Sequence, residues 1–299
     1  MSSKKTIDTL IPDFYALFTD GHISEESLLE HYGKMVAKNL GESLSRSLEE
    51  REPRLRMSAI GKPSRQIFYE LSKAPREPFK ASTLIKFQYG HLLEEMILYL
   101  AKEAGHLVED EQKEVDFKGI KGHMDARVDR VKIDVKSASD FSFKKFKDGS
   151  IREDDAFNYI PQLAGYQQAD TDNPNEDGAF LVINKVTGEL CLSKFPAAEL
   201  AAVDIKGHVE RQKKVSAIVA SKDLENVPER CFEPVSDGGK AGNMILGVNC
   251  RYCPFKVHCW RDMNDGWGLR SFNYYGGPKF FTHIEKEPRT QELMLPEIK

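Results

Sequence analysis

The segment VKIDVKSA at residues 131–138 constrains the fold of this chain more than any other. Hydrophobic and charged residues alternate along it, and alternation with a period of two is typical of a β-strand. Ile133 and Val135 therefore lie on one face, whereas Asp134 and Lys136 lie on the other. The pattern predicts a half-buried strand with a hydrophobic core on one side and a pair of opposite charges on the other.

Further helical and strand patterns surround this strand. A strand is expected at 121–128, and only Asp129 and Arg130 separate it from the next one, which predicts a tight hairpin. Helices are expected at 24–50, 64–72, 82–103, 155–170 and 196–221, and further strands at 107–118, 178–184 and 189–194. This order predicts an α/β or α+β fold with a mixed central β-sheet flanked by helices.

The chain divides into three expected parts. A helical arm at 1–53 precedes a core at 54–222. The tail at 223–299 is rich in Gly and Pro, reads as irregular, and contains four of the five cysteines. We expect the arm and this cysteine-bearing tail to pack on the core.

Composition narrows the class of protein. The chain has 299 residues, of which 40% are hydrophobic, and a net charge of −4, which argues against a protein that coats DNA without sequence preference. It contains no run of about 18 apolar residues and no secretory signal, so we expect no membrane span and a cytoplasmic location. An odd number of cysteines in a reducing compartment disfavours a disulfide framework.

An acidic pair and a lysine are the candidate catalytic groups. Asp125 precedes Asp134 by nine residues, so the predicted hairpin brings both carboxylates close to Lys136. Carboxylates and phosphate oxygens satisfy Mg²⁺, and a lysine can orient water or stabilise charge on phosphorus. The alternative is a surface ion pair on a half-exposed strand, because an isolated Asp-x-Lys triplet is common.

The order of several motifs resembles that of the PD-(D/E)xK nuclease superfamily, in particular its RecB-like and phage exonuclease branches. The motifs are RMSAIGKPSRQIFYEL at 56–71, YGHLLEEMI at 89–97, GHMD at 122–125, DVK at 134–136 and QLAGY at 162–166. The resemblance spans roughly residues 54–260. It implies a restriction-endonuclease-like core.

The resemblance implies roles for individual residues. Asp125, Asp134 and the backbone carbonyl of Val135 would be metal ligands, and Lys136 would be the catalytic lysine. Glu94 would be the helical carboxylate of the metal site.

Two neighbours on the helix compete with Glu94. Glu95 is one position out of phase with Gly90 and His91. His91 is a second candidate, because some RecB-like members use a histidine on this helix.

Gln162 and Tyr166 match the Q-x-x-x-Y signature and lie four residues apart on one helix face. The resemblance implies that they hold DNA or brace the lysine. The alternative is a polar pair that caps the sheet.

The implied activity is that of a Mg²⁺- or Mn²⁺-dependent deoxyribonuclease. It would be a phage-type exonuclease that hydrolyses DNA from an end, in recombination or DNA degradation, in the host cytoplasm if a phage encodes it. DNA would be its partner, together with a single-strand-binding or annealing protein. The alternatives are a structure-specific or CRISPR-adaptation-like endonuclease, and a DNA-binding module with an inactive nuclease core.

A basic segment follows the catalytic strand. Three lysines alternate there with three phenylalanines, namely Lys144, Lys145 and Lys147 with Phe141, Phe143 and Phe146. The lysines could contact phosphates and the phenylalanines could stack on bases. Alternatively, the phenylalanines anchor the segment and the lysines are solvated. Arg65 is a further candidate phosphate contact.

The cysteines of the tail form a candidate metal centre. Cys250-x-x-Cys253 and Cys259 lie within ten residues, and Cys231 precedes them by nineteen. Four thiolates could hold a [4Fe–4S] cluster or Zn²⁺, or the cysteines could bind no metal. In RecB-like families with a cluster, the fourth cysteine usually precedes the core, in the segment that matches 60–68. This chain has none there, so Cys231 would have to be the fourth ligand, with His258 and Cys191 as weaker substitutes.

Overall fold

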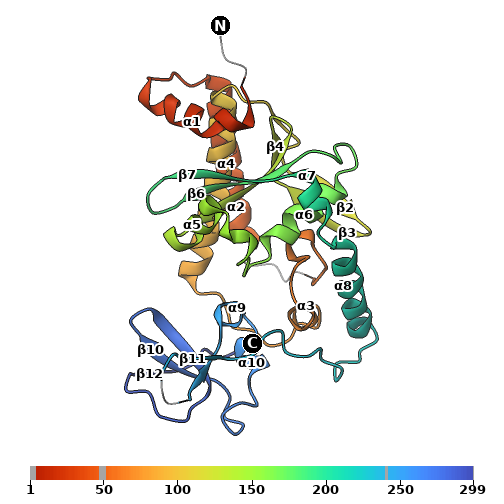
Figure 1. Ribbon diagram of the computed structural model, residues 1–299, viewed down its shortest axis with the longest axis vertical. Coiled ribbons are helices and arrows are strands. Elements are labelled where there is room, and N and C mark those ends of the chain that lie inside the picture. Colours follow the sequence, from red (N-terminus) through yellow and green to blue (C-terminus); the bar gives the residue numbers. More distant parts are fainter. Residues whose placement is uncertain (1–4, 47–51, 240–241, 299) are drawn as a thin grey trace. The chain divides into compact units, whose positions relative to one another are not determined.

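The computed structural model describes residues 5–46, 52–239 and 242–298, and these divide into two compact units (Figure 1). Unit 1 takes the described residues within Met1–Glu52, Arg56–Gly61 and Ala81–Val209. Unit 2 takes those within Pro53–Leu55, Lys62–Lys80 and Glu210–Lys299. The domain boundaries expected from the sequence remain a prediction.

Unit 1 contains most of the helices and strands expected from the sequence. Its helices are α1 (Leu10–Thr19), α2 (Glu26–Arg46), α4 (Ala81–Glu103), α5 (Asp140–Asp148), α6 (Tyr159–Ala169) and α7 (Ala197–Ala201), with 3₁₀ turns at Ile7–Thr9, Met57–Ala59 and Ser150–Arg152. Its strands are β1 (Val108–Glu109), β2 (Lys113–Phe117), β3 (Ile120–Met124), β4 (Ala126–Val128), β5 (Val131–Ala138), β6 (Gly178–Asn184) and β7 (Leu190–Phe195). Residues 47–50 of the helix expected at 24–50 lie outside the described ranges.

A five-stranded sheet in the order β1-β4-β5-β6-β7 forms the centre of unit 1. β5 and β6 are parallel and the other neighbours are antiparallel, so the sheet is mixed, as predicted. The predicted hairpin is confirmed: β4 pairs with β5 from Val128↔Val131 onward, and both turn residues, Asp129 and Arg130, have positive φ angles of 48° and 66°.

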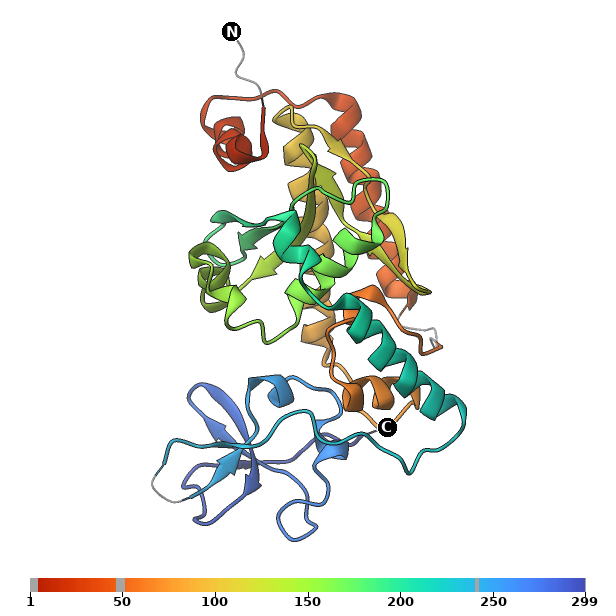
Figure 2. The ribbon, with the colours of Figure 1, turned by 45° about the vertical axis from the view of Figure 1, so that its right-hand side comes forward.

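Helices cover both faces of this sheet (Figures 1 and 2). Every residue of β6 is buried, which is typical of a strand with layers on both sides. Ala179 and Leu181 pack in one core with α1 and α4. Phe180 points to the opposite face, where its ring lies 5.3 Å from that of Phe146 in α5 and 5.4 Å from that of Phe195.

The single strand expected at 121–128 is wrong in one respect, because the chain changes partner within it. β3 pairs with β2 in a separate two-stranded sheet, from Lys113↔Met124 to Phe117↔Ile120. β4 then joins the central sheet. Asp125 lies between the two strands, and this change of partner is a long-range event that local alternation does not encode.

Met57 packs between β3 and α6 and requires two glycines there. Its side chain is fully buried. A Cβ added to Gly122 in β3 would lie 2.4 Å from Cβ of Met57, and one added to Gly165 in α6 would lie 2.5 Å from its Sδ. Since Gly122 and Gly165 belong to the GHMD and QLAGY motifs, this close approach sets the distance between the two segments.

Unit 2 contains the cysteine-bearing tail, which is more regular than expected. Its helices are α3 (Ser64–Leu71), α9 (Val248–Arg251) and α10 (Lys256–Cys259), and α8 (Ile205–Ala220) continues into it from unit 1. Its strands are β8 (Val235–Ser236), β9 (Met244–Ile245), β10 (Arg270–Tyr274), β11 (Gly277–His283) and β12 (Glu292–Leu293).

These strands form a sheet in the order β12-β10-β11-β9-β8, so the expectation of an irregular tail is wrong. Phe272 and Phe281 are buried with ring centroids 5.3 Å apart and form part of its core. Three of the five strands have only two residues, which is too short for a period-two signal. Among the described residues, no helix combines the length and hydrophobicity that a bilayer span requires.

The contact of Met57 with Gly122 predicts the effect of a single methyl group. Gly122→Ala should lower the free energy of unfolding by about 1–3 kcal/mol, because Cβ of Met57 is fixed to its backbone and cannot give way. Urea denaturation measures the change. Gly33→Ala in α2 is the control: its Cβ would meet nothing within 4 Å, so it should raise stability by about 0.5–1 kcal/mol. A neutral Gly122→Ala would contradict the packing described.

Candidate active site

Asp125 is held at the point where β3 ends and β4 begins. One of its carboxylate oxygens, Oδ2, accepts a hydrogen bond of 2.8 Å from the backbone N–H of Val135 in β5. The bond crosses the hairpin and fixes the carboxylate beside the strand that carries Asp134. The hairpin thus brings together the two acidic residues that the sequence analysis paired.

Asp134 and Lys136 project from the same face of β5, opposite the face on which Ile133 and Val135 join the hydrophobic core. Asp134 is buried, with an exposed fraction of 1%. Its Oδ2 forms an ion pair with Nζ of Lys136. The alternative to a catalytic role was a surface ion pair on a half-exposed strand, but the carboxylate of this pair is buried.

Gln162 and Tyr166 on α6 support Asp134. Nε2 of Gln162 lies 3.3 Å from Oδ1 of Asp134 and 3.1 Å from the hydroxyl of Tyr166. Tyr166 is buried, with 3% exposed. The pair therefore orients the carboxylate, and the tyrosine ring is enclosed by protein.

Glu94 brings a third carboxylate to this site from α4. Its Oε1 accepts a 2.6 Å hydrogen bond from Nε2 of Gln112. Glu95 instead accepts a 2.8 Å bond from Asn39 of α2, and the side chain of His91 is exposed. Of the three candidates on this helix, Glu94 is the one whose charge interacts with both Asp125 and Asp134.

Burial and mutual repulsion raise the pKa values of Asp125 and Glu94. The pKa of Asp125 is well above its ordinary value, because of burial and then of the charges on Asp134 and Glu94. Burial, followed by the charges on Glu95 and Asp134, raises the pKa of Glu94 to about 7. Burial would lower the pKa of Lys136, but Asp134 and Asp125 outweigh it and raise that pKa, so the lysine is charged.

The donor set suits a hard divalent cation. Three carboxylates share one site with a single lysine, and a cation would favour the charged forms of Asp125 and Glu94, whose pKa values are raised by burial and then by repulsion. Oxygen ligands of this kind are those that Mg²⁺ and Mn²⁺ prefer, and the carbonyl of Val135 could add one more. Among the described residues, however, no three His, Cys, Asp or Glu side chains are placed as a complete ligand set around one point.

Three neighbours of the site were missed by the sequence analysis. Nζ of Lys136 lies 4.9 Å from the ring centroid of Tyr159, at the start of α6. Asp155 caps that helix, because its carboxylate accepts bonds of 2.9 and 2.8 Å from the N–H groups of Tyr159 and Ile160. Gln112, in a loop, holds Glu94. Tyr159 is three residues before Gln162 on the same helix, a spacing that could have indicated it.

The basic segment after the catalytic strand is helix α5. Phe143 and Phe146 are buried, which supports the anchoring alternative for them, whereas Phe141 is 73% exposed. Lys145 forms an ion pair with Asp154, and Lys147 forms one of 2.5 Å with Glu189. Lys144 is exposed. Carboxylates thus already offset two of the three candidate phosphate contacts.

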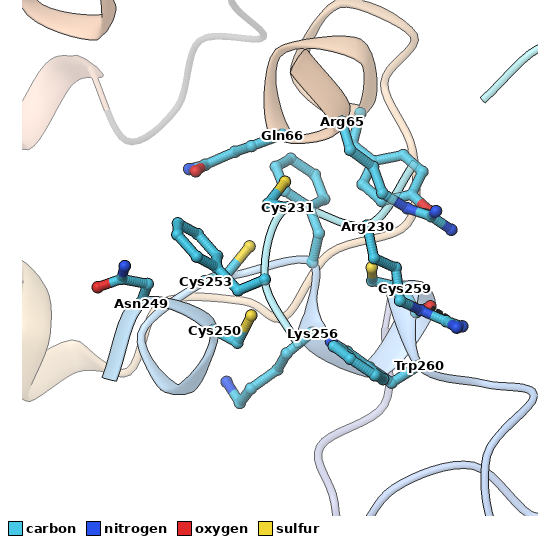
Figure 3. Close-up of a pocket in the computed structure, with 13 residues that line it drawn as sticks. Arg65, Gln66, Arg230, Cys231, Asn249, Cys250, Cys253, Lys256, Cys259 and Trp260 are labelled. Atoms are coloured by element: carbon cyan, nitrogen blue, oxygen red, sulfur yellow. Dashed lines mark hydrogen bonds between the residues drawn. The ribbon is translucent and has the colours of Figure 1, made fainter. Parts of the chain in front are cut away.

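The four tail cysteines lie around one cavity in unit 2 (Figure 3). All four are free thiols, and Cys191 is separate from them, buried in β7. Burial, and then the neighbouring sulfurs, raise the pKa of Cys250 to about 12. Burial also raises the pKa of Cys253 to about 11. These thiols therefore keep their protons unless a cation displaces them.

Hydrogen-bond donors surround the sulfur atoms. Burial raises the pKa of Cys231, but the backbone N–H groups of Gln66 and Arg65, in the first turn of α3, lower it. The backbone of Phe255 does the same for Cys253. N–H donors of this kind stabilise thiolates, so the cavity is chemically suited to a thiolate-bound metal centre.

Comparisons with known proteins give weak similarities. The sequence matches no protein-family model and no curated protein. A solved structure described as SSO0001 has a TM-score of 0.40 and 19% identity, covering 76% of this chain and 95% of that one. A phage-related exonuclease from Haemophilus somnus 129PT has a TM-score of 0.42 and 16% identity, with 58% and 97% covered.

An alkaline exonuclease from Laribacter hongkongensis has a TM-score of 0.33 and 12% identity, with 58% of this chain and 95% of that one covered. Scores this low do not establish a shared activity.

The raised pKa of Glu94 predicts how the stability of the metal-free protein depends on pH. Between its ordinary pKa of 4.5 and about 7, the folded state binds more protons than the unfolded state. The free energy of unfolding should therefore fall as pH rises through this window and level off above it. Urea denaturation at a series of pH values measures the slope.

Glu94→Gln should flatten this slope, and Glu30→Gln is the control. Glu30 is exposed on α2, where it pairs with Lys34 at 4.0 Å, so its replacement should leave the slope in place. Equal slopes in the Glu94→Gln variant and in the wild type would show that Glu94 does not titrate in this window.

Proposed function

We propose that this chain is a metal-dependent deoxyribonuclease whose active site comprises Glu94, Asp125, Asp134 and Lys136. The observation that carries the proposal is the crowding of three carboxylates and one charged lysine at one site, where burial and then repulsion raise the pKa values of Asp125 and Glu94. A merely structural ion pair needs one carboxylate for one lysine. An excess of buried negative charge is typical of a site that binds a cation.

Each residue has a proposed role. Glu94, Asp125, Asp134 and the carbonyl of Val135 would hold Mg²⁺ or Mn²⁺, which when bound polarises a phosphate oxygen and lowers the pKa of water. Lys136 would stabilise the negative charge that develops on the phosphoryl group and orient the attacking water. Gln162, through its contact with Asp134, would keep that carboxylate in position.

Tyr159 and Tyr166 would position Lys136 and Gln162, respectively. The ring of Tyr159 lies beside the ammonium of Lys136 and limits where it can point. Tyr166 is buried, so we assign it to bracing Gln162 rather than to holding DNA.

The proposed reaction is hydrolysis of DNA phosphodiester bonds from an end. The preference for ends rests on the resemblance of the ordered motifs to the phage exonuclease branch. A structure-specific endonuclease would use the same carboxylates and lysine, so DNA topology distinguishes the two. Lys144 and Arg65 are the candidate phosphate contacts that remain, since Lys145 and Lys147 already form ion pairs with carboxylates.

Replacement of Asp134 tests the active site. Asp134→Asn should reduce cleavage of linear DNA in Mg²⁺ by at least about 10²–10³-fold, because removal of a single preorganised electrostatic group has an effect of about that size. Gel analysis of linear and covalently closed DNA, with Mg²⁺ and with EDTA, measures the activity. Degradation of only the linear form is expected.

Glu95→Gln is the matched control for this experiment, since it neutralises the adjacent carboxylate that faces α2. It should keep wild-type activity. An Asp134→Asn variant that cleaves at the wild-type rate would refute the assignment, and binding of DNA without cleavage by the wild type would favour the inactive module.

We propose that Cys231, Cys250, Cys253 and Cys259 hold a [4Fe–4S] cluster, with Zn²⁺ as the alternative. The arrangement of the four thiols around one cavity supports the proposal, as do the N–H donors directed at Cys231 and Cys253. The centre would be structural, since it would tie the tail to α3 within unit 2.

Elemental analysis and an absorption spectrum of anaerobically purified protein test this centre. Cys231→Ser should lose most of the bound metal, because one of four ligands is removed. Cys191→Ser is the control, since Cys191 is buried in β7 among core residues and should leave the metal content unchanged. Wild-type protein that contains neither iron with sulfide nor zinc would contradict the proposal.

A further inference from the structure

A second cavity in unit 2, distinct from the proposed active site, has an unusual charge. It has a volume of about 510 Å³, within the range of ligand pockets. The positively charged side chains that line it are those of Arg65, Lys73, Arg230 and Arg261, whereas Asp262 is the one carboxylate in its lining. This excess of positive charge contrasts with the net charge of −4 for the whole chain.

Two of the arginines are fixed in place. Nε of Arg65 donates a 2.9 Å hydrogen bond to the hydroxyl of Tyr69, and its Nη1 donates a 3.1 Å bond to the carbonyl of Pro228. Nη2 of Arg230 donates a 3.0 Å bond to the carbonyl of Cys259 and pairs with Asp262. Both guanidinium groups extend to the same side, away from Cys250 and Cys253 (Figure 3).

The single carboxylate does not cancel the charge of the pocket. Asp262 already pairs with Arg230, so this carboxylate does not offset the charges of Arg65 and Arg261. Arg261 and Lys73 are exposed at the surface. A pocket of this kind attracts an anion with several negative oxygens, such as a phosphate.

One part of the lining is apolar. Phe68, Pro75, Leu224 and Val227 contribute hydrocarbon surface, and Leu224 is 50% exposed. A free inorganic anion would make no favourable contact with this apolar surface. A nucleotide would, because its base can lie against apolar side chains while its phosphate contacts the arginines.

We infer that this pocket binds a nucleotide unit of single-stranded DNA. A concave pocket with an apolar wall suits an unstacked base, which a duplex does not offer. The identification of the strand as DNA rests on the proposed function, and the pocket would then hold the strand at a point separate from the catalytic carboxylates.

Oligonucleotide binding tests the inference. The probe is fluorescein-labelled oligothymidylate, its binding is followed by fluorescence anisotropy, and all proteins carry Asp134→Asn to prevent cleavage. Lys73→Asn with Arg261→Gln should raise Kd about tenfold, because two phosphate contacts are lost. The slope of log K against log salt should shrink by about 1.4, since each contact on a single strand contributes about 0.7. Asn suits position 73, where φ is 54°.

Lys286→Gln with Arg289→Gln is the matched control. It removes the same two charges from exposed positions of unit 2 that do not line the pocket, and it should leave Kd and the salt slope near those of the parent. Both variants must contain the same amount of metal, so that a change in binding can be assigned to the pocket and not to the cysteine centre.

The outcomes are distinct. An unchanged Kd and salt slope in the pocket variant would overturn the inference. An equal loss of affinity in the control variant would also overturn it, as would a loss of affinity that appears only with a blunt duplex as the probe. If the wild type cleaves no DNA but the pocket variant still weakens oligonucleotide binding, the pocket stands and the nuclease proposal fails. If cleavage depends on Asp134 but oligonucleotide binding is the same in the pocket variant and its parent, the nuclease proposal stands and the pocket inference fails.

Discussion

Repulsion among three carboxylates that share one site is the constraint on which the rest of unit 1 depends. Each carboxylate comes from a different element and interacts with its own donor. The N–H of Val135 binds Asp125, which lies between two strands, and the ammonium of Lys136 pairs with Asp134 of β5. The amide of Gln112 binds Glu94 of α4. Without those donors the charges would be driven apart or neutralised by protons. The fold therefore stores unfavourable electrostatic energy at one place, and such an arrangement persists where a cation or a developing charge makes use of it.

The packing beneath the site maintains this crowding. Met57 contacts the glycines of two motifs, Gly122 and Gly165, so β3 and α6 approach more closely than residues with a Cβ would allow. Asp125 follows Gly122 by three residues, and Gln162 precedes Gly165 by three, so both polar groups are carried by the segments that Met57 holds together. Each motif thus combines a polar residue of the site with a glycine that packing requires. A change at Gly122 would displace the segment that carries Asp125, and a change at Gly165 would displace the one that carries Gln162.

Local patterns predicted much of unit 1 and little of unit 2, for a physical reason. Alternation identified β5, and the two-residue turn identified its hairpin, because both signals lie within a few residues. The change of partner at Asp125, the contact of Tyr159 with Lys136 and the bond from Gln112 to Glu94 depend on segments far apart in the chain. The tail sheet was missed because β8, β9 and β12 are each two residues long and are stabilised by their neighbours rather than by their own sequence.

The missing upstream cysteine has a structural counterpart. In the families that the motifs resemble, the segment matching residues 60–68 usually supplies the fourth thiolate. Here the first turn of α3, in that same segment, instead directs the N–H groups of Arg65 and Gln66 at Cys231. A hydrogen-bonded helix terminus favours a thiolate without binding the metal itself. In the proposed centre the tail would dock on α3 through an outer contact while all four ligands would come from residues 231–259, and Arg65 lines both this cavity and the neighbouring basic pocket.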